Sequence, residues 1–296
     1  MTYDIGKQYN IDNPFKKKAR LHQSKYRSEI LQVDFDEYGN RLTESDANLG
    51  LNFYNGLNIF KAVKQRYPKY SKGLYADMLR SEHIPFNIFI PFKSTTELTK
   101  YIFSSFLPVE IVEIIAIEIE YAPSPAKDYL NDRTAFDTFI EYRNAQNKNG
   151  IIGIEVKYTE QEYKLRQGSK EEKDIQNKDS IYYQLTKNSG LYKPEKITEL
   201  PKDRYRQVWR NHLLGESMIL KKALRYSEFT SVILYPTGNH HFTEVAKEYR
   251  EFLSRTSKDR FCTITFEAFF ELIEQNVNSE ELRDWVNYLK ARYLFE

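Results

Sequence analysis

Residues 134–160 read TAFDTFIEYRNAQNKNGIIGIEVKYTE and carry the clearest strand pattern of the chain. Two runs, 134–142 and 150–158, alternate apolar and polar residues and are rich in β-branched and aromatic side chains. The polar stretch between them, Asn-Ala-Gln-Asn-Lys-Asn-Gly, has the composition of a turn. The sequence therefore predicts a β-hairpin here.

The second run of this hairpin separates its side chains onto two faces. Successive side chains of a strand point in opposite directions. Glu155 and Lys157 therefore share one face with Gly153, while the other face carries Ile152, Ile154, Val156 and Tyr158. On the first run, a suitable register places Asp137 beside Glu155. Two carboxylates and an ammonium on a rigid hairpin form a site suited to a divalent metal ion and a phosphodiester.

These residues, with several short words around them, resemble the PD-(D/E)XK nuclease superfamily, which has the restriction-endonuclease-like fold. Asp137 followed by Glu155-Val156-Lys157 is similar to the D…(D/E)xK signature. One departure is that Phe136, not proline, precedes Asp137. The similarity to a bacterial family of predicted nucleases extends over about residues 45–240 and rests on Leu51–Tyr54, Glu120–Pro123, Asp132–Asp137, Gly153–Glu160 and Gln207–Leu214.

The resemblance implies a fold and a set of roles. The fold class is α/β, with a restriction-endonuclease-like core of order α-β-β-β-α-β, a mixed central sheet flanked by helices, and helical additions at both ends. Asp137, Glu155 and the carbonyl of Val156 are the implied metal ligands. Lys157 is the implied partner of the attacking water and the scissile phosphate, and Gln207 completes the implied catalytic set.

Three further residues are candidates for supporting roles. Glu120 belongs to the Glu-Tyr-Ala-Pro word and would supply a third carboxylate. Asn52 sits on the N-terminal turn of the helix predicted over 48–67, and Arg210 shares a helix face with Gln207. The alternative for Glu120 is a surface carboxylate, for Asn52 a helix-capping amide, and for Arg210 a solvated guanidinium.

Composition bounds the class of protein. The chain has 296 residues, 44 basic and 42 acidic, for a net charge of +2, which leaves room for a local basic groove. The single cysteine excludes an internal disulfide and a cysteine-cluster zinc site. No apolar run approaches the ~18 residues of a membrane span, and the N-terminus lacks a signal-peptide core. We expect a cytoplasmic protein without a membrane or nucleotide-cofactor partner.

The remaining segments fit one domain over 1–296, with a basic segment at 1–27 that is either an arm for a phosphate backbone or a solvated N-terminal segment. Apolar spacing predicts helices at 48–67 and 203–226, and a strand at 110–121. Two prolines make 84–92 a loop or edge segment. Residues 161–203 form a charged excursion. After it come strands at 231–237 and 261–266 and helices at 243–254, 267–275 and 279–294.

The predicted function is Mg²⁺-dependent hydrolysis of DNA phosphodiesters by an endonuclease in restriction or phage defence, with Mn²⁺ able to substitute. The predicted partners are DNA and a second copy of the chain, because one metal site per chain cuts one strand. Three alternatives stay open: a catalytically silent DNA-binding or assembly module, a glycosidase that uses Asp137 and Glu155, and a plain surface salt bridge between Glu155 and Lys157.

Overall fold

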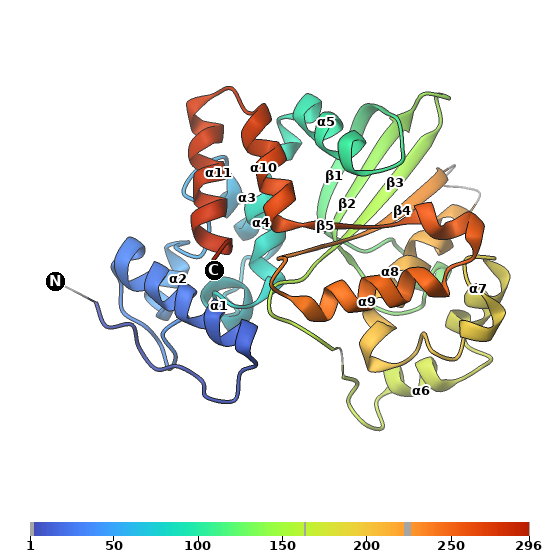
Figure 1. The fold of residues 1–296 in the computed structure, drawn as a ribbon, viewed down its shortest axis with the longest axis horizontal. Coiled ribbons are helices and arrows are strands. Elements are labelled where there is room, and N and C mark those ends of the chain that lie inside the picture. Colours follow the sequence, from blue (N-terminus) through green and yellow to red (C-terminus); the bar gives the residue numbers. More distant parts are fainter. Residues whose placement is uncertain (1–2, 163, 222–225, 296) are drawn as a thin grey trace.

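The computed structural model describes residues 3–162, 164–221 and 226–295. Its centre is a five-stranded mixed sheet in the order β1-β2-β3-β4-β5 (Figure 1). The first three strands are antiparallel, and β3, β4 and β5 run parallel. The strands are β1 (Ile111–Tyr121), β2 (Phe136–Asn144), β3 (Asn149–Val156), β4 (Tyr226–Tyr235) and β5 (Phe261–Thr265).

The predicted hairpin is present as β2 and β3. Asn144 shapes its turn, because the Asn144 side-chain oxygen accepts hydrogen bonds from the backbone N–H groups of Gln146 and Lys148, each at 3.0 Å. Asn147 adopts the left-handed conformation that asparagine tolerates. The register pairs Thr138 with Ile154, and one residue further along it sets Asp137 opposite Glu155.

Helices cover both faces of the sheet. One face packs against helices from the two ends of the chain, namely α1 (Pro14–Lys25), α2 (Glu44–Asn48), α3 (Ile59–Arg66), α4 (Ile84–Phe89), α5 (Thr96–Phe106), α10 (Phe266–Asn276) and α11 (Glu280–Tyr293). The other packs against α7 (Ile181–Asn188), α8 (Asp203–Leu220) and α9 (His240–Phe252), with α6 (Lys170–Gln176) nearby (Figure 1). The order α5-β1-β2-β3-α8-β4 confirms the predicted fold class.

The alternation predicted for β3 divides the two cores. Ile152, Ile154, Val156 and Tyr158 lie in the first hydrophobic cluster, whereas Ile151 lies in the second, which α8 covers. Gly153 allows the ring of Phe136 to lie close, since a β-carbon at Gly153 would be 2.3 Å from that ring. Glu155 lies on the same face of β3 as Ile151 and Gly153, and this tightly packed face is the one that α8 covers.

Two predictions for the N-terminal half were wrong. The helix predicted over 48–67 is only α3, preceded by a loop in which Leu57 and Asn58 have positive φ; the three-residue spacing reflects loop side chains that pack inward. In the segment 84–92, residues Ile84–Phe89 form the buried helix α4 and a 3₁₀ turn begins at Pro91, so the segment is neither a loop nor an edge strand. Pro85 occupies the first turn of α4, where no backbone N–H is needed.

Other helix and strand boundaries also differ from those predicted from the sequence. The excursion 161–203 contains α6 and α7, and β4 begins five residues before the predicted strand. The helix predicted over 203–226 ends at Leu220, and its positions 222–225 lie outside the described residues. In the part of the chain that the structure describes, no helix is both long and apolar enough to cross a membrane.

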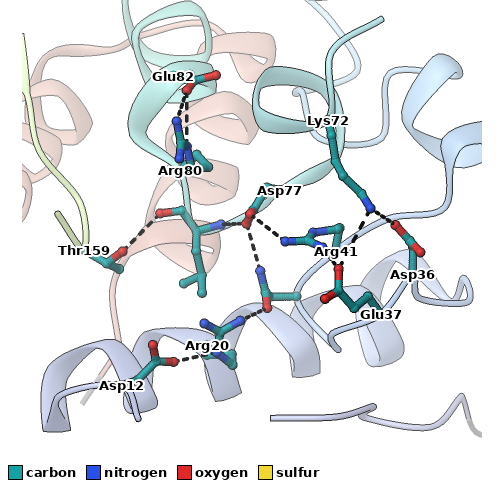
Figure 2. Close-up of polar contacts among 12 residues, drawn as sticks. Asp12, Arg20, Asp36, Glu37, Arg41, Lys72, Asp77, Arg80, Glu82 and Thr159 are labelled. Atoms are coloured by element: carbon teal, nitrogen blue, oxygen red, sulfur yellow. Dashed lines mark hydrogen bonds and ion pairs between the residues drawn. The ribbon is translucent and has the colours of Figure 1, made fainter. Parts of the chain in front are cut away.

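The basic N-terminal segment is tied to the body of the protein. Residues 14–25 form α1, whose Arg20 is buried and donates to Asp12 at 2.6 Å (Figure 2). In the same view Asp77 accepts from Arg41, and Arg80 pairs with Glu82. Lys17 and Lys18 remain exposed on α1. The segment is therefore a packed helix that keeps three exposed lysines, Lys17, Lys18 and Lys25.

Candidate active site

The ends of three adjacent strands bring the predicted carboxylates together. Glu120, Asp137 and Glu155 line one pocket of about 230 Å³, whose wall is completed by Arg133, Thr134, Ala135, Gln207, Arg210 and Asn211. Antiparallel pairing sets Glu120 opposite Asp137, and Asp137 opposite Glu155. Of the sequence-predicted residues, Lys157 does not line the pocket but pairs with Glu155, Val156 follows Glu155 in the chain, and Asn52 lies elsewhere.

Asp137 is held by the neighbouring strand. Its Oδ2 accepts a hydrogen bond from the backbone N–H of Val156 at 2.7 Å. This bond locks the Asp137 carboxylate onto β3, beside the Val156 peptide whose carbonyl was predicted as a ligand. Enclosure in protein and the charges of Glu155 and Glu120 raise the pKa of Asp137 well above its ordinary value.

Glu155 is a buried carboxylate with partners on both oxygens. Its Oε1 accepts from Lys157 Nζ and Gln207 Nε2, and its Oε2 accepts from Asn211 Nδ2. Glu155 and Lys157 are 5% and 3% exposed, so the pair is no surface salt bridge. Two charges this deeply buried need each other and further hydrogen bonds to compensate their lost hydration.

The Lys157 ammonium keeps its charge in this setting. Burial lowers the pKa of Lys157, but the charges of Glu155 and Asp137 outweigh that effect and raise the pKa above its usual value. The backbone N–H of Lys157 donates to the carbonyl of Leu234 on β4 at 2.9 Å. Lys157 is thus a fixed positive charge beside two acidic groups.

Glu120 stands in an unusual backbone conformation. Its φ is +56°, in the left-handed region that side chains other than those of glycine and asparagine rarely adopt. Such strain costs about 1–3 kcal/mol and is common at functional sites. Burial and the charges of Glu155 and Glu82 raise the pKa of Glu120 to about 7. Arg66 donates to the Glu120 carbonyl at 3.0 Å, which anchors the end of β1 to α3.

The helix α8 supplies the polar side chains opposite the hairpin. Gln207 and Asn211 lie one turn apart and both reach Glu155, as their i, i+4 spacing allows. Arg210 turns to a different set of acceptors: it donates to Asp132 Oδ2 at 2.8 Å and Thr134 Oγ1 at 2.9 Å, and pairs with Glu171. Its guanidinium is therefore committed to the turn before β2.

Asn52 is a buried structural amide. It donates to the Leu74 carbonyl at 3.0 Å and accepts from Arg292 at 2.7 Å. It is fully buried and does not line the pocket. This contact lies between the N-terminal loop and α11, because the predicted helix that was to carry Asn52 toward the sheet is a loop.

Three contributors to the site were not proposed from the sequence. Asn211 could have been found, since it shares a helix face with Gln207. Glu82 and Arg66 could not, because they act on Glu120 from segments that share no pattern with the hairpin.

The donors present suit a hard divalent cation. Asp137 and Glu155 offer carboxylate oxygens, which Mg²⁺ prefers. Burial, together with the charges of Glu155 and Glu120, raises the pKa of Asp137, and a bound cation would offset those charges. Among the described residues, no group of three or more His, Cys, Asp and Glu side chains is arranged to hold a metal ion. The Val156 carbonyl, water or substrate would have to supply the other ligands.

Comparison with known protein families matches residues 10–295 to the PD-(D/E)XK nuclease superfamily. The match covers nearly the whole chain, and the chain belongs to this superfamily. Membership in a nuclease superfamily suggests nuclease activity, which agrees with a site of acidic residues and a lysine on a hairpin. Searches of curated proteins and of solved structures found no match.

Proposed function

We propose that this protein is a Mg²⁺-dependent endonuclease that hydrolyses DNA phosphodiesters. The observation that carries the proposal is that Asp137 and Glu155 line one pocket at the end of the β2–β3 hairpin, with the Lys157 ammonium paired to Glu155. Mn²⁺ would substitute for Mg²⁺, because both take oxygen ligands. A setting in restriction or phage defence, and action as a homodimer, complete the proposal.

Each residue has a task in this chemistry. Asp137, Glu155 and the Val156 carbonyl would hold the metal, which activates water and polarises the phosphate. The Lys157 ammonium orients the attacking water and stabilises charge that develops on the phosphate. Gln207 and Asn211 fix the Glu155 carboxylate, so its oxygens stay directed into the pocket. Glu120 adds negative charge near the ligands when it is ionised.

A plasmid assay tests this function. Supercoiled plasmid is incubated with the protein in Mg²⁺, in Mn²⁺ and in EDTA, alongside Lys157→Ala. Lys148→Ala is the matched control, since Lys148 is exposed at the opposite tip of the same hairpin. We expect nicking or cutting with either metal, none in EDTA, and none with Lys157→Ala. Cutting that survives both EDTA and the Lys157 substitution would refute the mechanism.

A catalytically silent DNA-binding module is the second candidate. It is favoured by the engagement of both Glu155 oxygens with Lys157, Gln207 and Asn211. In this reading the carboxylates serve only the fold. Tight DNA binding with no cleavage in Mg²⁺ or Mn²⁺ would establish it, and plaque counts on cells that carry the gene would test the defence setting of either candidate.

A further inference from the structure

The pocket contains one cation whose role the catalytic set does not explain. Arg133 lines the pocket beside Asp137 and Glu155 and is exposed. The other guanidinium in the pocket wall, Arg210, is committed to Asp132, Thr134 and Glu171. Within residues 3–162, 164–221 and 226–295, no hydrogen bond or ion pair engages the side chain of Arg133.

The turn that carries Arg133 is held from several sides. The Asp132 side chain accepts from the Thr134 backbone N–H at 2.9 Å, which closes the turn on itself. Arg210 donates to Asp132 and Thr134, and the Tyr182 hydroxyl donates to Asp132. Residues on each side of Arg133 are therefore fixed, while its own side chain is left for an external partner.

The chemistry of a guanidinium identifies that partner. Arginine binds phosphate through paired N–H donors and keeps its charge at any working pH. Because the turn leads directly into β2, an anion held by Arg133 would lie at the mouth of the pocket near Asp137. A metal ion would be repelled by Arg133, so the partner is an anion and not a second cation.

We propose that Arg133 forms a phosphate subsite for the backbone of a bound DNA strand, and that Arg210 is a positioning residue that holds the turn for it. This inference rests on the proposed function, because it places the substrate of that same site. It also makes specific the supporting role for which the sequence analysis names Arg210 a candidate. The positioning is carried by the hydrogen bonds of Arg210 to Asp132 and Thr134.

Binding without cleavage tests the subsite. The full chain is titrated in EDTA against a fluorescein-labelled DNA duplex, and separately against a single strand, over a series of KCl concentrations. Arg133→Gln should weaken binding about tenfold and lower the slope of log K against log salt by about one phosphate contact. Arg255→Gln is the matched control, because Arg255 is exposed and lies just before β5, at the opposite end of the parallel strands.

The role of Arg210 is tested by a double substitution. If Arg210 acts through Arg133, Arg210→Gln weakens binding, but the Arg133→Gln, Arg210→Gln double variant binds no more weakly than Arg133→Gln alone. Tyr182→Phe removes the hydroxyl that donates to Asp132 in this turn, and it should cause a smaller loss of DNA affinity. Thermal melts of each variant check that the protein is folded.

The outcomes distinguish a failure of the proposed phosphate subsite from a failure of the proposed nuclease function. If the wild type cleaves plasmid and Arg133→Gln binds DNA with unchanged affinity and salt slope, the subsite is refuted and the nuclease stands. If the wild type neither binds nor cleaves DNA, both fall. If the losses of affinity in the double variant add, the positioning role of Arg210 is refuted, while the Arg133 subsite stands.

Discussion

At the scale of single residues, the site is a balance of charges that protein alone leaves incomplete. Glu120, Asp137 and Glu155 repel one another, and Lys157 is the cation placed among them. Proteins hold such unfavourable arrangements where function needs them, at a cost in stability.

Asp137→Asn should stabilise the metal-free protein while it abolishes cleavage. The pKa of Asp137 is raised in the folded state, so ionisation favours unfolding once the pH exceeds the ordinary value near 4. Asparagine keeps an oxygen for the Val156 N–H and carries no charge. Thermal melts in EDTA at about pH 8 should show a higher Tm for the variant, since each unit of pKa shift is worth about 1.4 kcal/mol.

The wild type should lose this disadvantage as the pH falls toward the unfolded pKa, and the two melting curves should converge there. Glu118→Gln serves as the control, because Glu118 lies on β1 but is exposed and pairs with Lys93 outside the pocket. An Asp137→Asn variant that melts below the wild type in EDTA at alkaline pH would contradict the charge balance described here.

Glu120 should make metal affinity depend on pH near neutrality. Its pKa of about 7 means that the carboxyl is protonated below that pH and charged above it. Mg²⁺ should therefore bind more tightly as the pH rises through about 7. Glu120→Gln should remove this inflection and leave a flatter profile. Titration calorimetry with Mg²⁺ over the pH range measures it, and an unchanged inflection in the variant would assign the effect to another group.

At the scale of elements, α8 is what aligns the helix side of the pocket with the hairpin. It lies so close to β4 that a β-carbon at Gly215 would be 2.2 Å from the ring of Phe229. Gly215→Ala should therefore push α8 away from the sheet and destabilise the fold by about 1–3 kcal/mol. The same displacement would draw Gln207 and Asn211 away from Glu155 and weaken Mg²⁺ binding.

Urea unfolding and Mg²⁺ titration of Gly215→Ala measure the two effects. Leu220→Ala is the control on the same helix, because Leu220 is 51% exposed. We expect the control to keep both stability and metal affinity. Gly215→Ala with wild-type stability would mean that α8 and β4 can accommodate the extra methyl group.

The elements also show how far sequence reasoning reaches. Period-two alternation predicts β1, β2 and β3 and brings Asp137 to Glu155, because strand pairing is local and a hairpin fixes its own register. Periodicity fails at 48–67, where loop residues such as Leu51 and Tyr54 pack inward at helix-like spacing. Asn52 moves with that loop to Arg292. The contributions of Glu82 and Arg66 depend on tertiary packing that no local pattern encodes.

At the scale of the whole molecule, each hydrophobic cluster encloses a neutral histidine. His83 is fully buried on the side of the sheet that α11 covers, and burial together with the charge of Arg292 holds its pKa well below the ordinary value. His212 on α8 is fully buried among aromatic rings on the other side, where burial and Arg260 lower its pKa to about 3. Low pH should therefore destabilise the protein through both hydrophobic clusters.

Stability should fall as the pH drops below the unfolded histidine pKa of about 6.5. Below that pH the unfolded chain binds protons at His83 and His212, while the folded protein does not, so protonation pulls the equilibrium toward unfolding. Each histidine contributes a slope of up to about 1.4 kcal/mol per pH unit. His212→Phe, which keeps a ring beside Phe229 and Tyr249, should remove one such contribution.

Urea unfolding at several pH values measures the slopes, with His240→Phe as the control because His240 is exposed. Equal slopes for His212→Phe and the wild type would show that His212 is protonated in the fold and that acid acts elsewhere.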